Sequence, residues 1–450
     1  MDTKTVKDFP LAKYAAEHWV AHAQFQDVAS HVKHGMKDLF DPEKPYFATW
    51  IGTHDMDSGG LFCTRPTPLY YSSLRGFREL TKDLSIKYPQ YANAIGGRYD
   101  FPLLAALSQG HVEVAELLCE HGGDVDARGT RGRTQLYTSL SSSYLDRNFS
   151  RSVLFLLEHR ADPNLRCRDG KTPLHILFSH LHGNDVLPVA LLLLEHRADP
   201  NLKSKDGETP LQILLGGRQS FLSGYPNYNG NDILLVVKLL LEHGADVNPR
   251  HKGRETPIRL ALRHEAFNAA RCFLDHGADP DSEHEEGKTP LHKLLGPQHC
   301  GLCSYYYPPD FILVIAQLLL ERGADVNAQD NDHKTPLLLA IQHGTSDIVS
   351  FLLEHGADPN MEDNEGNTLL HTLLLERDKD KDDDDVLILQ SLLKLGTDTS
   401  ARNKNHATPL DLASYYGKVL IAQVLLDHAN VLEGEYPHCN NFVAVLLTFQ

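Results

Sequence analysis

Residues Gly170–His175 read Gly-Lys-Thr-Pro-Leu-His, and the same six residues return at Gly287–His292. A second phrase, Leu-Leu-Glu-His-Gly-Ala-Asp, is complete at Leu240–Asp246 and again at Leu352–Asp358. A fixed alternation of two phrases, with about 33 residues per cycle, indicates a solenoid of helix-turn-helix units. The sequence therefore predicts an all-α repeat fold and argues against an enzyme.

One position opens each unit and sets the register of the repeats. A threonine occupies it in all units but one, which has a phenylalanine: Thr67, Phe101, Thr134, Thr172, Thr209, Thr256, Thr289, Thr335, Thr368 and Thr408. The shortest spacing between these positions is 33 residues, and longer spacings mark insertions, among them residues 217–232, 297–310 and 376–386. Insertions in repeat proteins map to loops, so we expect about ten helical pairs with loops of unequal length.

The residues of each phrase suit one place in a helical pair. Thr172 can cap the first helix by accepting a backbone N–H, and Pro173 suits the first helical position because its missing N–H costs nothing there. Leu174 and Leu177 then point inward. Gly244 follows an apolar second helix and can end it in the left-handed conformation. The phrases therefore predict where each helix starts and ends.

This pattern resembles the ankyrin repeat over residues 65–430. The resemblance implies two antiparallel helices and a projecting β-hairpin finger per unit. The histidine that ends the first phrase is kept at His175, His292 and His371. Other residues replace it elsewhere: Tyr70, Leu104, Tyr137, Gln212, Arg259, Leu338 and Asp411. Arg160 and Arg197 occupy the position of the helix-ending glycine, which should strain those two turns by roughly 1 kcal/mol.

The composition is typical of a soluble intracellular protein. Hydrophobic residues make up 41% and charged residues 23% of the chain, close to globular averages. No apolar run reaches the roughly 18 residues that a membrane helix needs, and the first residues lack the pattern of a secretory signal. Seven scattered cysteines, an odd number, favour free thiols in a reducing compartment. We therefore expect a cytoplasmic location, with the nucleus as the alternative.

The first 60 residues do not follow the repeat. Apolar residues at helical spacing predict a helical N-terminal cap or junction over 1–60, a repeat solenoid over 61–430 and a C-terminal tail over 431–450. Residues Pro10–Trp19 and Gly35–Pro42 resemble the segment that joins a NACHT nucleotide-switch module to ankyrin repeats in fungal receptor-like proteins. The resemblance implies an alternative function, the ligand-sensing arm of a switch receptor whose ATPase module is absent from this chain.

Three other patterns suggest chemistry that the repeat explains better. Gly170-Lys171-Thr172 and Gly287-Lys288-Thr289 mimic a phosphate-binding loop, but Leu165 and Ser282 occupy the position of its first glycine. His299, Cys300 and Cys303 follow His292 and could ligate zinc, although a loop rich in tyrosine and proline is the simpler interpretation. The acidic run 378–385 lacks the turn glycine of a calcium loop. We therefore assign no catalytic residue, metal or cofactor.

The fingers between the two phrases carry an uneven distribution of charge. The early ones are basic: Arg128, Arg131, Arg133, Arg166, Arg168, Lys171, Lys203, Lys205, Arg250, Lys252 and Arg254. Later fingers are acidic, from Asp281 to Glu365, and the row turns basic again at Arg402 and Lys404. Stacked repeats would align such fingertips into a charged stripe. The alternative is that these fingertips are merely solvated.

The basic stripe leads to a hypothesis about partners. We expect a non-catalytic scaffold that binds a protein, in particular an acidic segment, on the concave face formed by fingers and first helices. The insertions at 217–232 and 297–310 would supply secondary contacts. The formal net charge of −17 argues against nucleic acid. We expect no membrane partner and no small-molecule substrate.

Overall fold

The computed structural model describes residues 37–43, 47, 66–129, 132–141, 148–180, 186–216, 230–249, 255–264, 266–283, 286–296, 309–342, 346–375 and 382–433. The described chain is helical, with each repeat contributing a first, inner helix and a second, outer helix. It falls into two compact units, the first ending at Asp246 and the second beginning at Val247. The two units are described separately below.

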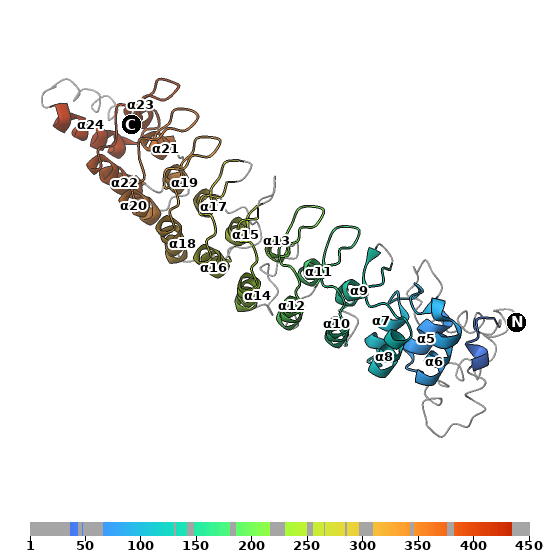
Figure 1. The fold of residues 1–450 in the computed structure, drawn as a ribbon. Helices are drawn as coiled ribbons and strands as arrows, with labels where there is room; N and C mark the ends of the chain where they lie inside the picture. Colours follow the sequence, from blue (N-terminus) through green and yellow to red (C-terminus); the bar gives the residue numbers. More distant parts are fainter. Residues whose placement is uncertain are drawn as a thin grey trace, which may run out of the picture. The chain divides into compact units, whose positions relative to one another are not determined.

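The described part of the first unit contains five helical pairs and one short 3-10 helix. In chain order its elements are α5 (Pro68–Leu74), α6 (Arg78–Lys87), η1 (Pro89–Tyr91), α7 (Pro102–Ser108), α8 (Val112–Glu120), α9 (Gln135–Ser141), α10 (Phe149–Glu158), α11 (Pro173–His180), α12 (Val186–Glu195), α13 (Pro210–Gly216) and α14 (Gly230–Glu242). The inner helices are the odd-numbered ones, and α9 packs against α11 and α11 against α13 (Figure 1).

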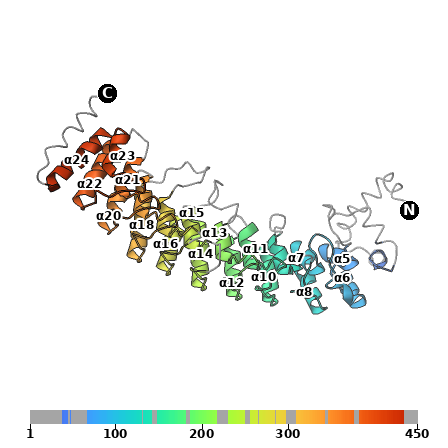
Figure 2. The same ribbon diagram turned by 90° about the horizontal axis from the view of Figure 1, so that it is seen from above.

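The second unit also contains five helical pairs. Its elements are α15 (Pro257–Arg263), α16 (Phe267–Asp275), α17 (Pro290–Leu295), α18 (Pro309–Glu321), α19 (Pro336–Gln342), α20 (Ser346–Glu354), α21 (Leu369–Leu375), α22 (Asp382–Lys394), α23 (Pro409–Tyr415) and α24 (Val419–Glu433). Each inner helix packs against the next one, in the order α15, α17, α19, α21 and α23. The outer helices form a second row alongside them (Figure 2). The predicted all-α repeat architecture is confirmed.

Threonine and proline start most of the inner helices as predicted, although α7 follows Phe101 and Thr256 makes no cap hydrogen bond through its side chain. Thr67 accepts a hydrogen bond from the backbone N–H of Tyr70 at 3.2 Å, and Thr408 accepts one from Asp411 at 3.2 Å. The Asp411 carboxylate in turn accepts from the Thr408 backbone N–H at 2.9 Å. These contacts satisfy N–H groups that have no partner inside the helix. Helix entry is therefore a local property of the repeated phrase.

The turn that ends an outer helix requires the left-handed conformation. Gly244 has φ of 81°, and the two arginines at the equivalent position, Arg160 and Arg197, both have φ of 69°. A side chain at such a φ carries steric strain that glycine avoids. The structure therefore confirms the position of the two predicted strained turns.

Replacing Arg160 or Arg197 by glycine is expected to raise the free energy of unfolding by about 0.5–1 kcal/mol, because the strain is relieved. Chemical denaturation of each variant measures this gain. Gly244→Ala is the reverse control: nothing lies within 4 Å of the added Cβ, so only backbone strain should lower stability. A destabilised Arg160→Gly variant would show that the arginine side chain contributes more than its backbone strain costs.

Asparagine side chains in the loops that follow the outer helices also join successive repeats. Asn164 donates from Nδ2 to the carbonyl of Arg197 at 2.9 Å, and its Oδ1 accepts the backbone N–H of Asp199 at 2.7 Å. Asn201, Asn248 and Asn327 repeat the same pair of bonds to the following repeat. Each asparagine therefore links the loops that follow neighbouring outer helices within a unit.

Several predicted segments lie outside the described residues. They comprise most of the predicted N-terminal cap, the cysteine-containing insertion, the acidic run 378–381 and residues 434–450 of the predicted tail. Within the predicted cap, Phe40 is completely buried and makes an edge contact with Phe77, with ring centroids 6.4 Å apart. Asp41 accepts hydrogen bonds from Lys87 at 3.1 Å and Tyr88 at 2.9 Å. Residues 37–43 therefore contact the first repeat, whereas the boundary of a cap at residue 60 stays a prediction.

Candidate interaction surface

The finger of the fourth repeat is a tight hairpin turn. The N–H of Cys167 donates to the carbonyl of Lys171 at 3.0 Å, and the N–H of Gly170 donates to that of Cys167 at 2.9 Å. Gly170 has φ of 73°, and a Cβ there would lie 2.8 Å from the backbone nitrogen of Lys205. Only glycine therefore allows this finger and the next to approach so closely.

Neighbouring fingers are hydrogen-bonded to each other. In the first unit, the N–H of Lys205 donates to the carbonyl of Asp169 at 3.1 Å, and Arg128 Nη1 donates to the carbonyl of Arg166 at 2.8 Å. In the second unit, backbone bonds of the same kind link Glu286 to Asn331, Asp332 to Asn364 and Glu365 to Lys404. The fingers of each unit project as loops beside the inner helices (Figure 1). They form a connected row, which we call the finger row.

The fingers form tighter hairpins than expected, because their two arms are too short to count as regular β-strands. Among the described residues, a β-bridge forms between Arg128 and Thr134. Other described fingers consist of a turn closed by a backbone bond across its base, as at Ser204 and Glu208, 2.9 Å apart from N to O. The fold is therefore all-α with hairpin turns between the pairs.

The predicted basic residues occupy two kinds of environment. Arg166, Arg168 and Lys205 are exposed at the fingertips and make no side-chain hydrogen bond or ion pair in the described part of the chain. Arg133 is half-buried, with its guanidinium 5.2 Å from the ring centre of Tyr137. Arg128 is exposed, and Lys171 and Lys203 are half-buried. The remaining four predicted residues, Arg131, Arg250, Lys252 and Arg254, lie outside the described residues.

Acidic fingertip residues modify the charge pattern inferred from sequence. Asp169 and Asp206 are exposed in the same fingers as Arg168 and Lys205. In the second unit, the carboxylate of buried Asp330 accepts two backbone N–H bonds at 2.9 Å inside its own finger. Some acidic residues thus have a structural role. The sequence interpretation missed it because it assumed that finger side chains make no contacts within the protein.

Three buried histidines connect each inner helix to the next finger. The ring Nδ1 of His175 accepts the backbone N–H of Thr172 at 3.1 Å, so the proton is on Nε2, which donates to the carbonyl of Glu208 at 3.0 Å. His292 and His371 make the same contacts to Lys334 and Ala407. Burial lowers the pKa of His175 to about 4. These histidines are therefore neutral structural bridges.

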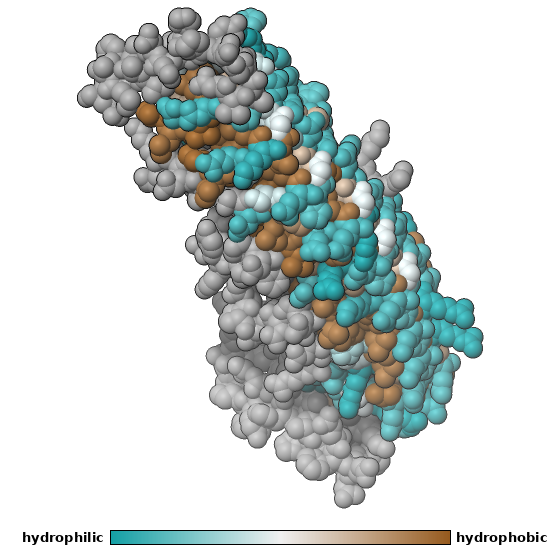
Figure 3. Space-filling model, turned by 90° about the vertical axis from the view of Figure 1, so that its left-hand side faces the viewer, coloured by the Kyte–Doolittle hydropathy of each residue, from teal (hydrophilic) through white to brown (hydrophobic). Residues whose placement is uncertain are grey.

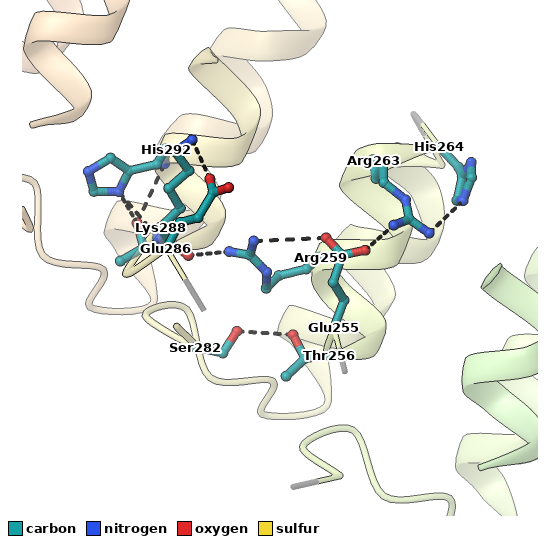
Figure 4. A network of polar contacts seen from close by, with 10 residues as sticks. Glu255, Thr256, Arg259, Arg263, His264, Ser282, Glu286, Lys288 and His292 are labelled. Atoms are coloured by element: carbon teal, nitrogen blue, oxygen red, sulfur yellow. Dashed lines mark hydrogen bonds and ion pairs between the residues drawn. The ribbon is translucent and has the colours of Figure 1, made fainter. Parts of the chain in front are cut away.

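In the sixth repeat an arginine replaces this histidine. Arg259 on α15 donates from Nη1 to the carbonyl of Lys288 in the next repeat, which is the same bridge made by a charged group. Glu255 forms ion pairs with Arg259 and with Arg263 (Figure 4). The hydroxyl of Thr256 lies 3.1 Å from that of Ser282, which belongs to the same following finger as Lys288. The substitution thus introduces a partly buried charge network that no other described inner helix contains.

A second surface feature is apolar and lies on outer helices. Leu387 on α22 and Leu420 on α24 are 62% and 58% exposed. With Val386, Gln390 and Val424 they line a shallow groove between the two helices. Figure 3 shows apolar patches among hydrophilic residues on the surface. The sequence offered no signal for this groove, because an exposed leucine and a buried one look alike in an apolar run.

The described residues show neither a metal cluster nor a membrane-spanning helix. They contain no group of three or more histidine, cysteine, aspartate or glutamate side chains that could hold a metal ion. No helix among the described residues is long and apolar enough to span a membrane. The zinc candidates His299, Cys300 and Cys303 lie outside the described residues. Lys171 and Lys288 belong to the two segments that resemble a phosphate-binding loop. In the structure, each lysine directly precedes the threonine before an inner helix, α11 or α17.

Comparison with known protein families confirms the repeat type. A model of three ankyrin repeats matches residues 227–299 and 312–380, and a model of a single ankyrin repeat matches 100–130, 169–205 and 286–331. The chain contains ankyrin repeats. Ankyrin repeats are scaffolds for protein–protein interaction and are generally non-catalytic, so the fingers and inner helices of these repeats are the surface to consider for function.

Two similar proteins cover only part of this ankyrin-repeat chain. The azaphilone pigments biosynthesis cluster protein L of Monascus ruber is 31% identical over 142 residues, which are 28% of this chain and 30% of that protein. A protein of Rickettsia felis, named as an ankyrin repeat protein, is 36% identical over 76 residues, 17% of this chain and 23% of its own length. The chain spans less than a third of the length of each relative.

Proposed function

We propose that this chain is a non-catalytic scaffold whose first-unit finger row binds an acidic segment of a protein partner. The observation that carries the proposal is the exposure of Arg166, Arg168 and Lys205 on neighbouring, hydrogen-bonded fingers without internal ion partners. Because hydrogen bonds already fix the backbone of these fingers, their cationic side chains can attract and orient carboxylates without a further loss of backbone entropy. Asp169 and Asp206 lie beside them and would help to set the register of the partner.

The proposal predicts a specific effect of charge reversal. The triple variant Arg166→Glu, Arg168→Glu and Lys205→Glu should bind a glutamate-rich peptide of roughly 20 residues at least about tenfold more weakly, since each lost or reversed contact contributes on the order of 0.5–1 kcal/mol. Fluorescence anisotropy of a labelled peptide measures the affinity. Binding should also weaken with rising salt.

The control makes the same change of charge on outer helices. Lys82, Arg151 and Lys238 are exposed on α6, α10 and α14, and their replacement by glutamate should leave the affinity within about twofold of wild type. Equal loss in both triple variants would mean that net charge rather than the finger row attracts the peptide. Strong, salt-sensitive retention on heparin, equal for wild type and both variants, would favour nucleic acid instead.

A second candidate function is the ligand-sensing arm of a NACHT-type receptor. It rests on the resemblance of residues 10–19 and 35–42 to the junction of such receptors, of which only 37–42 lie in the described part. The complete transcript tests it: an upstream phosphate-binding loop in the same reading frame would support a receptor, and a stop codon in that frame between the loop and Met1 would contradict it.

A further inference from the structure

The sixth and seventh repeats carry buried or half-buried positive charge at inner-helix positions where the neighbouring repeats bury neutral side chains. Arg259 is 3% exposed, at the position that holds a neutral histidine in three repeats. Its Nη1 makes the bridge to Lys288 that a histidine makes elsewhere, and its Nε has no hydrogen-bond partner. A neutral histidine would provide the bridge without the cost of burying a charge. The bridge alone therefore does not explain the arginine.

The neighbouring helix α17 shows a second departure from the pattern. Lys293 follows His292, and the equivalent residues Leu260 and Leu339 in the adjacent repeats are buried and apolar. Lys293 is half-buried, and its ammonium group forms no hydrogen bond or ion pair with the described chain. Burial lowers the pKa of Lys293, the Glu255 carboxylate raises it in part, and the positive charges of Arg259 and Arg263 lower it further. The ammonium group is thus partly desolvated and lacks a counter-ion of its own.

Among the described residues, the charges around Lys293 do not balance. Arg259, Arg263 and Lys293 share one largely buried carboxylate, that of Glu255, which is 12% exposed. The nearest other cation, Lys288, is already paired with Glu286 at 2.6 Å. Helices α15 and α17 pack against each other. Figure 4 shows Arg259 and Arg263, both on α15, pointing toward the carboxylate of Glu255. The surface formed by these helices therefore holds excess positive charge at reduced exposure.

We propose that the surface around Lys293 and Arg263, whose positive potential buried Arg259 increases, binds a carboxylate side chain of an acidic protein segment. It deepens the proposed function, on which it rests, by adding a second contact point in the other unit. A carboxylate there would supply the missing counter-ion to Lys293 and accept charge-assisted hydrogen bonds, which are roughly twice as strong as neutral ones. A partly desolvated site strengthens such contacts relative to exposed fingertips.

The test follows individual lysines in the full-length protein. Lysine amino groups are dimethylated with ¹³C, which preserves their charge, and the Lys293 signal is assigned by its absence in Lys293→Arg. The probe is the same glutamate-rich peptide. We expect the Lys293 signal to shift on titration and its apparent pKa to rise when the peptide binds, because a carboxylate favours the charged ammonium.

Variants separate a binding role from a structural one. Lys293→Gln should weaken the peptide complex about fivefold, whereas Lys394→Gln, an exposed control on outer helix α22, should leave it unchanged. Arg259→His restores the neutral bridge of the other repeats, so it should weaken peptide binding while the protein stays folded. Loss of binding with retained stability is a result that a purely structural arginine would not produce.

The outcomes distinguish this inference from the proposed function. Shifts at Lys171, Lys203 and Lys205 with a stationary Lys293 signal would overturn the inference and leave the finger row in place. Shifts at Lys293 alone would support the inference and contradict the finger-row proposal. No shift at any of the four lysines at millimolar peptide would overturn both. A response to phosphoserine peptide but not to glutamate peptide would overturn the assignment to carboxylate.

Discussion

Leu240→Ala is expected to lower the free energy of unfolding by about 3–5 kcal/mol. Leu240 is completely buried on α14, in the last helical pair of the first unit. Truncating it removes apolar burial and leaves a cavity that the packed repeats fill only in part. Urea denaturation followed by far-ultraviolet circular dichroism measures the loss.

The matched control for this prediction lies on the same helix. Leu235 is 46% exposed, so Leu235→Ala should change stability by no more than about 0.5 kcal/mol. Repeat proteins are stabilised mainly by contacts between neighbours, so hydrogen exchange should rise first in α12 and α14 of the Leu240 variant. Uniform loss of protection over the first unit would instead indicate that this unit unfolds as one cooperative block.

Between pH 6.5 and pH 4, the His175→Gln variant is expected to lose about 3 kcal/mol less stability than the wild type. An unfolded histidine takes up a proton near pH 6.5, whereas burial lowers the pKa of folded His175 to about 4. Between these values the unfolded chain binds more protons, so stability falls by about 1.4 kcal/mol per unit as the pH falls. Denaturation midpoints of both proteins across this range measure the difference in slope.

A neighbouring repeat supplies the reciprocal test. Gln212 occupies the equivalent position, and its Oε1 accepts the backbone N–H of Thr209 at 3.0 Å, as His175 Nδ1 does for Thr172. Glutamine therefore fits this site without titrating. Gln212→His should steepen the acid sensitivity by a similar amount, because it adds a buried histidine. Parallel slopes for wild type, His175→Gln and Gln212→His would show that other groups, such as the carboxylates, govern acid unfolding.

Parts of the structure could be predicted because they depend on neighbours in sequence. Thr67 and Thr408 cap their helices through atoms three residues away. Arg160 and Arg197 adopt the left-handed conformation because the turn after the outer helix demands it, whichever residue is present. The ankyrin-repeat fold follows from recurrence of these local rules. Domain limits and the partner of the finger row stay predictions.

The candidate surfaces depended on contacts between repeats. Sequence identified the basic residues of the early fingers but not the backbone bond from Lys205 to Asp169 that joins two of them. It showed that Arg259 replaces a histidine, but not that Arg259 and Arg263 share Glu255. That Lys293 shares the single carboxylate of Glu255 with two arginines also became visible only when α15 and α17 were placed side by side.

The sequence by itself determined the type of repeat, the helix starts and the strained turns, because hydrogen bonds and sterics within a few residues specify them. Only the tertiary structure decided which charges are buried, shared or unpaired. Those properties depend on solvent exposure and on partners about 30 or more residues away, as in the bond from His175 to Glu208, and a linear pattern contains neither distance nor dielectric environment.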